Sequence, residues 1–227
     1  MASDGTRLYQ ILPLVLLCLV ASPESPRGTF TPPSPPVEDS SCHEIWSLTQ
    51  QDNSDLSRIE ALCDQCLSTF LAPNQRAYVL TIRGKAVREQ GRYEHALQDF
   101  NEAIDLAPNY ALAHFHQAFT LAHFGHLEGA IQSYSRAIEL APDMSEAYRN
   151  RSFLYFHFNR MEEGLADLNK HIELEPSAEM YQLRGRILME IMDRPEEAEA
   201  DARKALELDP DIDVSSILNP EANATAP

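Results

Sequence analysis

Four histidines in one short stretch are the residues whose spacing most suggests chemistry. They lie in "AHFHQAFTLAHFGH", at His114, His116, His123 and His126. A metal site on a helix needs ligands three or four residues apart that converge from rigid elements. Only His123 and His126 have that spacing, and Gly125 between them predicts a turn. We therefore expect no metal site, but polar side chains that could change ligand affinity at about pH 6 to 7.

Candidate catalytic groups are also few. Ser133 has no evident triad partner, and the chain lacks a phosphate-binding glycine loop, a nucleophile elbow and a zinc-protease helix motif. The paired carboxylates Glu162–Glu163 and Glu196–Glu197 lie where acids favour the N-terminus of a helix. A hydrolase in the histidine-rich stretch would need a nucleophile or metal near His116 and His123. We expect a protein that is not an enzyme and uses no cofactor.

Cys63 and Cys66, in "CDQC", have the spacing of a redox pair. A thioredoxin-type motif needs a strand-to-helix context, whereas both thiols lie inside a predicted helix. If the chain is exported, Cys42 could bridge to Cys63 or to Cys66 and leave an odd thiol. If the chain is cytosolic, all of them stay reduced.

Composition limits the classes of function. The chain has 227 residues, 44% of them hydrophobic, which is enough to bury a core. Its formal net charge is -17, and non-specific nucleic-acid binding depends on Lys and Arg that neutralise phosphates. We expect no nucleic-acid partner.

The N-terminus differs from the rest of the chain. "ILPLVLLCLVA" ends at Ala21 and is shorter than the roughly 20 residues that span a bilayer, so 1–21 is predicted to be a signal peptide or a short membrane anchor. The proline-rich stretch 22–41 is predicted to be a disordered linker. These features favour an exported protein that is periplasmic, secreted or membrane-anchored, with a cytoplasmic location as the alternative.

A repeated pattern must position these side chains. "AIDLAPNY" returns as "AIELAPDM", "HIELEPSA" and "ALELDPDI", so Pro108, Pro142, Pro176 and Pro210 are 34 residues apart. Each unit contains two helix-length segments, and Gly91 lies at the end of the first one, where a left-handed backbone is common. Proline is expected to end each second helix, and Asp105 and its equivalents are expected to face water.

Aligning the units gives columns of small and large residues. The columns are Gly84, Ala118 and Ser152; Ala96, Ala130, Gly164 and Ala198; Phe100, Tyr134, Leu168 and Ala202; and Ala103, Ala137, His171 and Ala205. Small residues recur where two helices approach closely, and larger ones fill the space beside them. The pattern predicts stacked helical hairpins.

A helix-turn-helix unit of 34 residues with these columns resembles the tetratricopeptide repeat (TPR). The resemblance implies an all-α protein, a right-handed α-solenoid of stacked hairpins. Its departures are Leu80, His114 and Tyr148 in place of the usual Trp, and Gly185, which is displaced by one residue. The resemblance divides the chain into a degenerate hairpin at 42–76, four repeats at 77–110, 111–144, 145–178 and 179–210, and a tail at 211–227.

The resemblance also implies that function lies on a concave groove formed by the first helices. We expect outward-facing aromatic, histidine and cationic side chains there to bind a peptide segment of a partner protein. These are Lys85, Arg88, Phe115, His116, Phe119, His123, Arg149, Asn150, Phe153, Phe156 and His157. A groove of the kind that binds chaperone tails is disfavoured, because His116 replaces an asparagine and Glu146 replaces a lysine.

Self-association is the alternative function. The tail carries Ile212, Val214, Ile217 and Leu218 and could fold back over the final hairpin. Otherwise Leu188, Ile191 and Met192 could meet another subunit. The sequence therefore predicts a non-catalytic scaffold whose partner is a protein or a second copy, with a possible membrane tether at its N-terminus.

Overall fold

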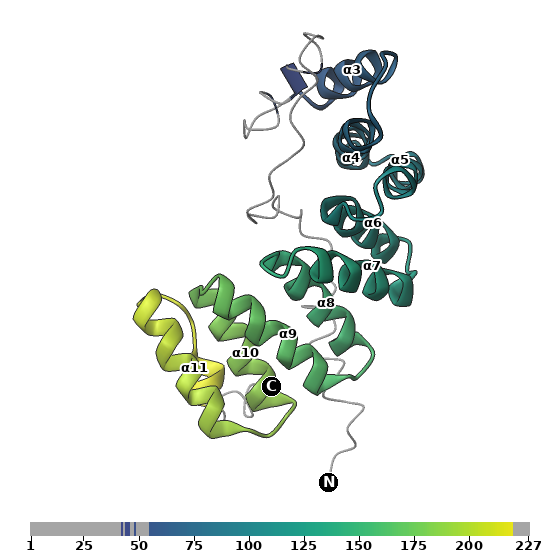
Figure 1. Cartoon of the computed structure of the whole chain (residues 1–227). Helices are drawn as coiled ribbons and strands as arrows, with labels where there is room; N and C mark the ends of the chain where they lie inside the picture. The colour runs from purple at the N-terminus through teal and green to yellow at the C-terminus, as the bar shows by residue number, and fades with distance from the viewer. Residues whose placement is uncertain (1–41, 43, 46–47, 49–54, 220–227) are drawn as a thin grey trace. The chain divides into compact units, whose positions relative to one another are not determined.

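The structure is a computed structural model that describes residues 42, 44–45, 48 and 55–219 (Figure 1). The predicted signal segment 1–21 and linker 22–41 lie outside these residues. The described residues contain helices and no strand, so the predicted all-α fold of successive helical hairpins is confirmed. The helices are α3 (Leu56–Leu67), α4 (Pro73–Glu89), α5 (Tyr93–Leu106), α6 (Ala111–His123), α7 (Leu127–Leu140), α8 (Ser145–His157), α9 (Met161–Leu174), α10 (Ala178–Glu190), α11 (Pro195–Leu208) and α12 (Ser215–Leu218).

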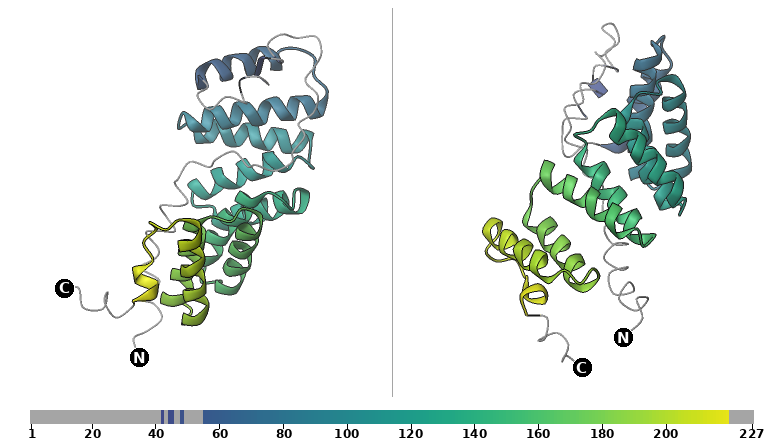
Figure 2. Two further views of the ribbon diagram at one scale, coloured as in Figure 1. Left: turned by 90° about the vertical axis from the view of Figure 1, so that its left-hand side faces the viewer. Right: turned by 60° about the horizontal axis from the view of Figure 1, so that its bottom comes forward.

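The chain forms two compact units, and the division between them falls within the sequence of α8. The N-terminal unit ends at Ala147 and the C-terminal unit begins at Tyr148. In the N-terminal unit α3 packs on α4, α4 on α5 and α6, and α6 on α7, and α3, α4 and α5 lie side by side (Figures 1 and 2). In the C-terminal unit α10 packs on α9 and α11, and α12 packs on α10 and α11.

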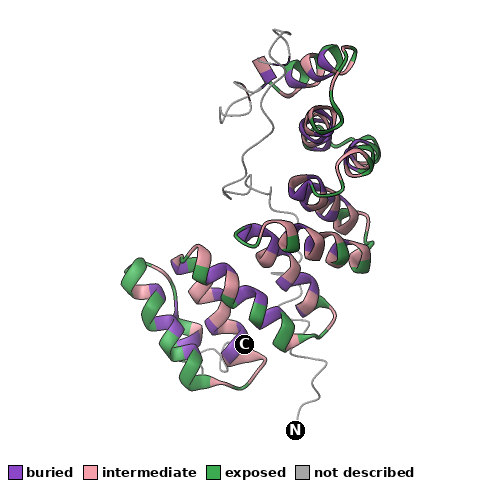
Figure 3. Ribbon diagram, in the orientation of Figure 1, coloured by how far each residue is buried: buried purple, intermediate pink, exposed green. Residues whose placement is uncertain are grey.

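Buried residues lie along the helices of both units, interspersed with exposed ones (Figure 3). The predicted columns account for the close approaches. A Cβ at Gly84 would lie 2.6 Å from the ring of Phe100, and a Cβ at Gly164 would lie 2.5 Å from the ring of Phe156. Glycine at these two positions therefore leaves room for a ring between paired helices.

The repeat prolines were predicted to end the second helices, and Gly91 to end a first helix in a left-handed conformation; both predictions are confirmed. The second helices end at Leu106, Leu140, Leu174 and Leu208, each two residues before a repeat proline. The turns inside the hairpins reverse through a left-handed residue: φ is 83° at Gly91, 75° at Gly125, 58° at Asn159 and 53° at Asp193. α4 begins at Pro73, four residues before the predicted first repeat, because proline fits the first turn of a helix.

A disulfide joins Cys42 to Cys66 on α3, with a Cα–Cα distance of 5.2 Å. Of the two pairings that the sequence left open, the structure contains this one. Cys63 is a free, buried thiol in the same hydrophobic cluster, and burial raises its pKa to about 12. The thiolate is therefore strongly disfavoured, which argues against a redox role for "CDQC".

The C-terminal segment covers the last hairpin. Val214 and Ile217, which is 1% exposed, pack with Leu188, Ala198 and Ala202. Ala202 stands where the other repeats have Phe100, Tyr134 or Leu168, and the side chain of Ile217 reaches to 3.0 Å from a Cβ built at Gly185. Of the two expectations for the tail, folding back is the one found.

Candidate functional site

A buried guanidinium connects α4 and α6 in the N-terminal unit. Arg88 is 3% exposed, and its Nη1 lies 3.2 Å from Nδ1 of His116. Because the guanidinium can only donate, Nδ1 accepts and the neutral ring carries its proton on Nε2. Burial, with Arg88 and Lys85 nearby, holds the pKa of His116 well below its ordinary value.

Partly exposed side chains surround this pair. The guanidinium of Arg88 lies over the ring of Phe119, 4.8 Å from its centroid, and Phe119 is half-buried. One turn further along α6, the exposed His123 stacks on Tyr93 with a centroid distance of 3.6 Å and an interplanar angle of 11°. Lys85 is half-buried, with Nζ 4.0 Å from Oε1 of Glu89. We call these four residues the α4–α6 surface: Lys85 on α4, Tyr93 at the start of α5, and Phe119 and His123 on α6.

Arg88, Phe115 and His116 were expected to face outward, and this expectation is wrong. Phe115 is 0% exposed and packs edge-on against Tyr134, with ring centroids 5.6 Å apart. His116 is 2% exposed. The reason is that α4 contacts α3, α5 and α6, and α6 contacts α4, α5 and α7, so more than one stripe of each helix is buried.

The predicted site residues on α8 show the same error. Phe153, Phe156 and Asn150 are 1%, 4% and 5% exposed. Both phenylalanines belong to a hydrophobic cluster with residues of α9 and α10. Arg149 is half-buried, and His157 is exposed and contacts Phe158 edge-on. The structure thus groups the α4 and α6 residues, and the α8 residues form a separate group in the C-terminal unit.

Sequence reasoning missed an ion pair that recurs within the hairpins. Each pair has two hydrogen bonds between a first-helix arginine and a second-helix aspartate: Arg83–Asp99 at 3.0 and 2.6 Å, Arg151–Asp167 at 2.7 and 2.8 Å, and Arg184–Asp201 at 2.7 and 2.6 Å. The second repeat replaces the pair by Gln117 and Ser133, whose side chains are 2.7 Å apart. An Arg and an Asp 16 or 17 residues apart in three repeats was the signal available.

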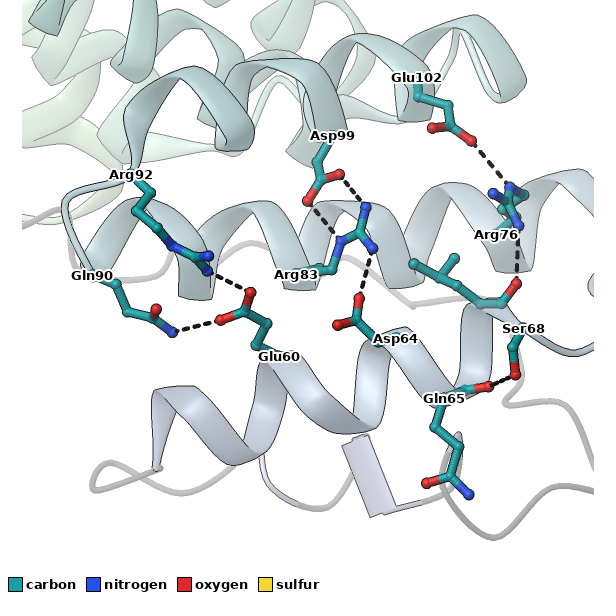
Figure 4. Close-up of polar contacts among 11 residues, drawn as sticks. Glu60, Asp64, Gln65, Ser68, Arg76, Arg83, Gln90, Arg92, Asp99 and Glu102 are labelled. Carbon is teal, nitrogen blue, oxygen red and sulfur yellow. Dashed lines mark hydrogen bonds and ion pairs between the residues drawn. The ribbon is translucent and has the colours of Figure 1, made fainter.

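The first of these pairs also connects neighbouring hairpins (Figure 4). Arg83 on α4 lies between Asp99 on α5 and Asp64 on α3, and its Nη1 is 2.7 Å from Oδ1 of Asp64. Nearby, Glu60 on α3 accepts hydrogen bonds from Gln90 and Arg92 in the α4–α5 turn. The bonds to Asp99 raise the pKa of Arg83 above its ordinary value. These contacts fix α3 to the first full repeat.

Two further classes of site find no candidate among the described residues. In that part of the chain, no three His, Cys, Asp or Glu side chains come together as a metal ion requires. His114 instead binds the backbone, with Nε2 2.9 Å from the carbonyl oxygen of Pro108. The helices of the described segments include none with the length and hydrophobicity needed to cross a membrane.

Comparisons with known proteins define the class. Models of the TPR repeat match residues 84–122, 123–179 and 178–212, and the chain belongs to the TPR family. No curated protein sequence matches it.

Solved structures share the fold at low sequence identity. A crystal structure of MamA is 18% identical, covers 84% of this chain and 100% of its own, and has a TM-score of 0.62. MamA from Desulfovibrio magneticus RS-1 is 18% identical over 76% of this chain and 95% of its own, with a TM-score of 0.61. YrrB is 18% identical over 79% of this chain and 88% of its own, with a TM-score of 0.59.

Proposed function

We propose that this TPR protein is a non-catalytic scaffold that binds a peptide segment of a partner protein, with the α4–α6 surface as the contact. The observation that carries the proposal is the half-buried ring of Phe119 held 4.8 Å above the buried guanidinium of Arg88. A ring fixed in this way offers apolar area with little loss of side-chain entropy on binding. Lys85 and His123 add polar contacts beside it.

A fold comparison supports the class of function. YrrB is described as a TPR protein with an unusual peptide-binding site. Its identity to this chain is too low to transfer individual residues. The partner of this chain is therefore to be found by experiment, and no catalytic step is proposed.

The test is capture from native extract followed by titration. The chain and a Phe119→Ser, His123→Ser variant would each be used as bait, and the captured proteins identified by mass spectrometry. Binding of the purified partner would then be measured by calorimetry. Glu139→Ala, an exposed change on α7, is the matched control. Phe153 is unsuitable as a test position because it is 1% exposed, and its loss would weaken the fold.

We expect the double variant to lose at least about tenfold in affinity, since a buried aromatic contact typically contributes more than 1 kcal/mol to binding. The control should bind as the unmodified chain does. If the double variant retains full affinity while circular dichroism shows it to be folded, the α4–α6 surface is not the contact.

We also propose that the chain is exported. The Cys42–Cys66 disulfide supports this, because such bonds persist mainly in oxidising compartments. N-terminal sequencing of the protein purified from its own cells would test it. A new N-terminus near Ser22 supports export with cleavage, whereas an intact N-terminus with both cysteines reduced favours the cytoplasm.

A further inference from the structure

In the α8–α9 hairpin two arginines lie over one aromatic ring. The guanidinium carbon of Arg151 lies 5.5 Å from the centroid of Tyr155, and that of Arg160 lies 4.4 Å from the same centroid. Both groups are paired with carboxylates: Arg151 donates twice to Asp167, and Arg160 donates to Oε1 of Glu163 at 2.9 and 2.7 Å. Two ion-paired guanidinium groups thus contact one ring.

The next hairpin repeats the two arginines but not the ring. Arg184 binds Asp201 through the same atoms that Arg151 uses, and Arg194 binds Glu197 at 2.6 Å. The residue in the place of Tyr155 is Leu188. A cleft of about 280 Å³ lies here, lined by Arg184, Arg194, Leu188 and Leu165, among others. Its place in the repeat corresponds to that of the missing ring.

The chemistry of the cleft favours an uncharged ring over an anion. Both arginines are already paired with carboxylates, so little positive charge remains for a second acid. The apolar part of the cleft lining consists of the mostly buried side chains of Leu165 and Leu188, together with Ala200. A guanidinium group attracts an aromatic face within about 6 Å of the ring centroid.

The N-terminal unit displays a suitable ring. Large hydrophobic side chains that are exposed in the described part of the chain are Phe70, Leu208 and Leu218, and only Phe70 is aromatic. It is 100% exposed, in the connection between α3 and α4. The surrounding residues 68–72 carry no charge, so this loop can approach the ion-paired rim without burying an unpaired charge.

We propose that the cleft binds Phe70 of a second copy of the chain. The ring would contact Arg184 and Arg194 as Tyr155 contacts Arg151 and Arg160. Phe70, which we call the knob, and the cleft are different surfaces of the chain, so the contact between two copies is heterologous. Repeated contacts of this kind produce open head-to-tail chains. The contact is small, so association is weak and depends on concentration.

The test measures molecular mass against concentration by sedimentation equilibrium, using the full chain. Phe70→Ser removes the knob, and Leu188→Tyr supplies the missing ring from within the hairpin. We expect the average mass of the unmodified chain to rise with concentration. Each variant alone should show an association constant lower by about tenfold or more, corresponding to roughly 1.4 kcal/mol.

Mixing the two variants gives the sharpest readout. The Phe70→Ser chain keeps its cleft and the Leu188→Tyr chain keeps its Phe70, so the mixture should form one-to-one dimers and nothing larger. Arg194→Ala is a second cleft variant, needed if Leu188→Tyr disturbs the core. Leu208→Ser, which removes another exposed hydrophobic residue, is the matched control and should associate as the unmodified chain does.

Three results would overturn the proposal. The unmodified chain could stay monomeric at all concentrations, a folded Phe70→Ser variant could associate normally, or the mixture could fail to form dimers. The α4–α6 surface plays no part in this test, so its result is independent of peptide binding by that surface.

Discussion

His116 is a buried imidazole beside two cations, and its pKa is held well below the ordinary value. Its neighbours are Arg88 and Lys85 on α4, the ring of Phe100 on α5, 5.6 Å away between centroids, and Phe115 beside it on α6. Protonation would place a second positive charge next to Arg88 at a position that is 2% exposed. The folded state therefore binds this proton less readily than the unfolded chain does.

This gives a pH dependence with a defined sign. The pKa of His116 is lower in the folded protein than in the unfolded chain, where it is about 6.5. The stability of the fold is therefore unaffected by His116 above about pH 6.5. Below that pH the free energy of unfolding falls by up to about 1.4 kcal/mol per pH unit. Asn150 occupies the equivalent position one repeat later, so His116→Asn is a suitable variant. Urea unfolding of both proteins at about pH 7.5 and 5.5 should show a smaller loss for the variant. Equal losses would contradict a neutral, buried His116.

The left-handed turn residues give a second prediction. Gly91 and Gly125 adopt positive φ at no steric cost, whereas Asn159 and Asp193 adopt it with a Cβ present. We expect Asp193→Gly to raise the free energy of unfolding by up to about 1 kcal/mol, and Gly91→Ala to lower it by about 1 kcal/mol or more. Urea unfolding measures both. Changes of the same sign would show that the turn conformation does not control stability at these positions.

Within a hairpin, the Arg–Asp pair is the contact that joins the two helices through charge. Asp99 is 8% exposed, so losing its arginine leaves a nearly buried carboxylate without that partner. The second repeat achieves the same link with the neutral Gln117 and Ser133. The second repeat therefore shows which neutral pair can replace the Arg–Asp ion pair in this fold.

We expect Arg83→Gln to destabilise the protein by about 2 kcal/mol, because Asp99 keeps its charge and loses two hydrogen bonds. Adding Asp99→Ser should recover at least half of that loss, since the pair then matches the neutral one. Unfolding of the single and double variants by urea gives the coupling energy. If the double variant were less stable than Arg83→Gln alone, the two hairpins would not be equivalent here.

Considering the whole molecule, the 34-residue period was enough to predict the fold. It identified helices, their proline ends and the small residues at close contacts, because these depend on neighbours within one hairpin. The period could not show which first-helix residues stay exposed. Phe153 packs with Leu183 and Ile187 of the next hairpin, and α6, which carries Phe115, also contacts α4 and α5 of the preceding hairpin. Burial of this kind depends on how hairpins stack. The Arg–Asp pairs were visible in the sequence but required side-chain geometry to be recognised.

The short helix α12 has a consequence for where the folded protein ends. The repeat pattern stops at Pro210, yet Ile217 occupies the space that a ring fills in earlier repeats and Ala202 leaves open. A chain cut by repeat boundaries would therefore keep every repeat and still lose part of its core. We expect truncation after Pro210 to lower the unfolding free energy by about 2 kcal/mol or more and to expose apolar surface that binds hydrophobic dyes. Fragments for interaction screens should extend through Leu218, because a shorter fragment would bind other proteins non-specifically through its exposed apolar surface.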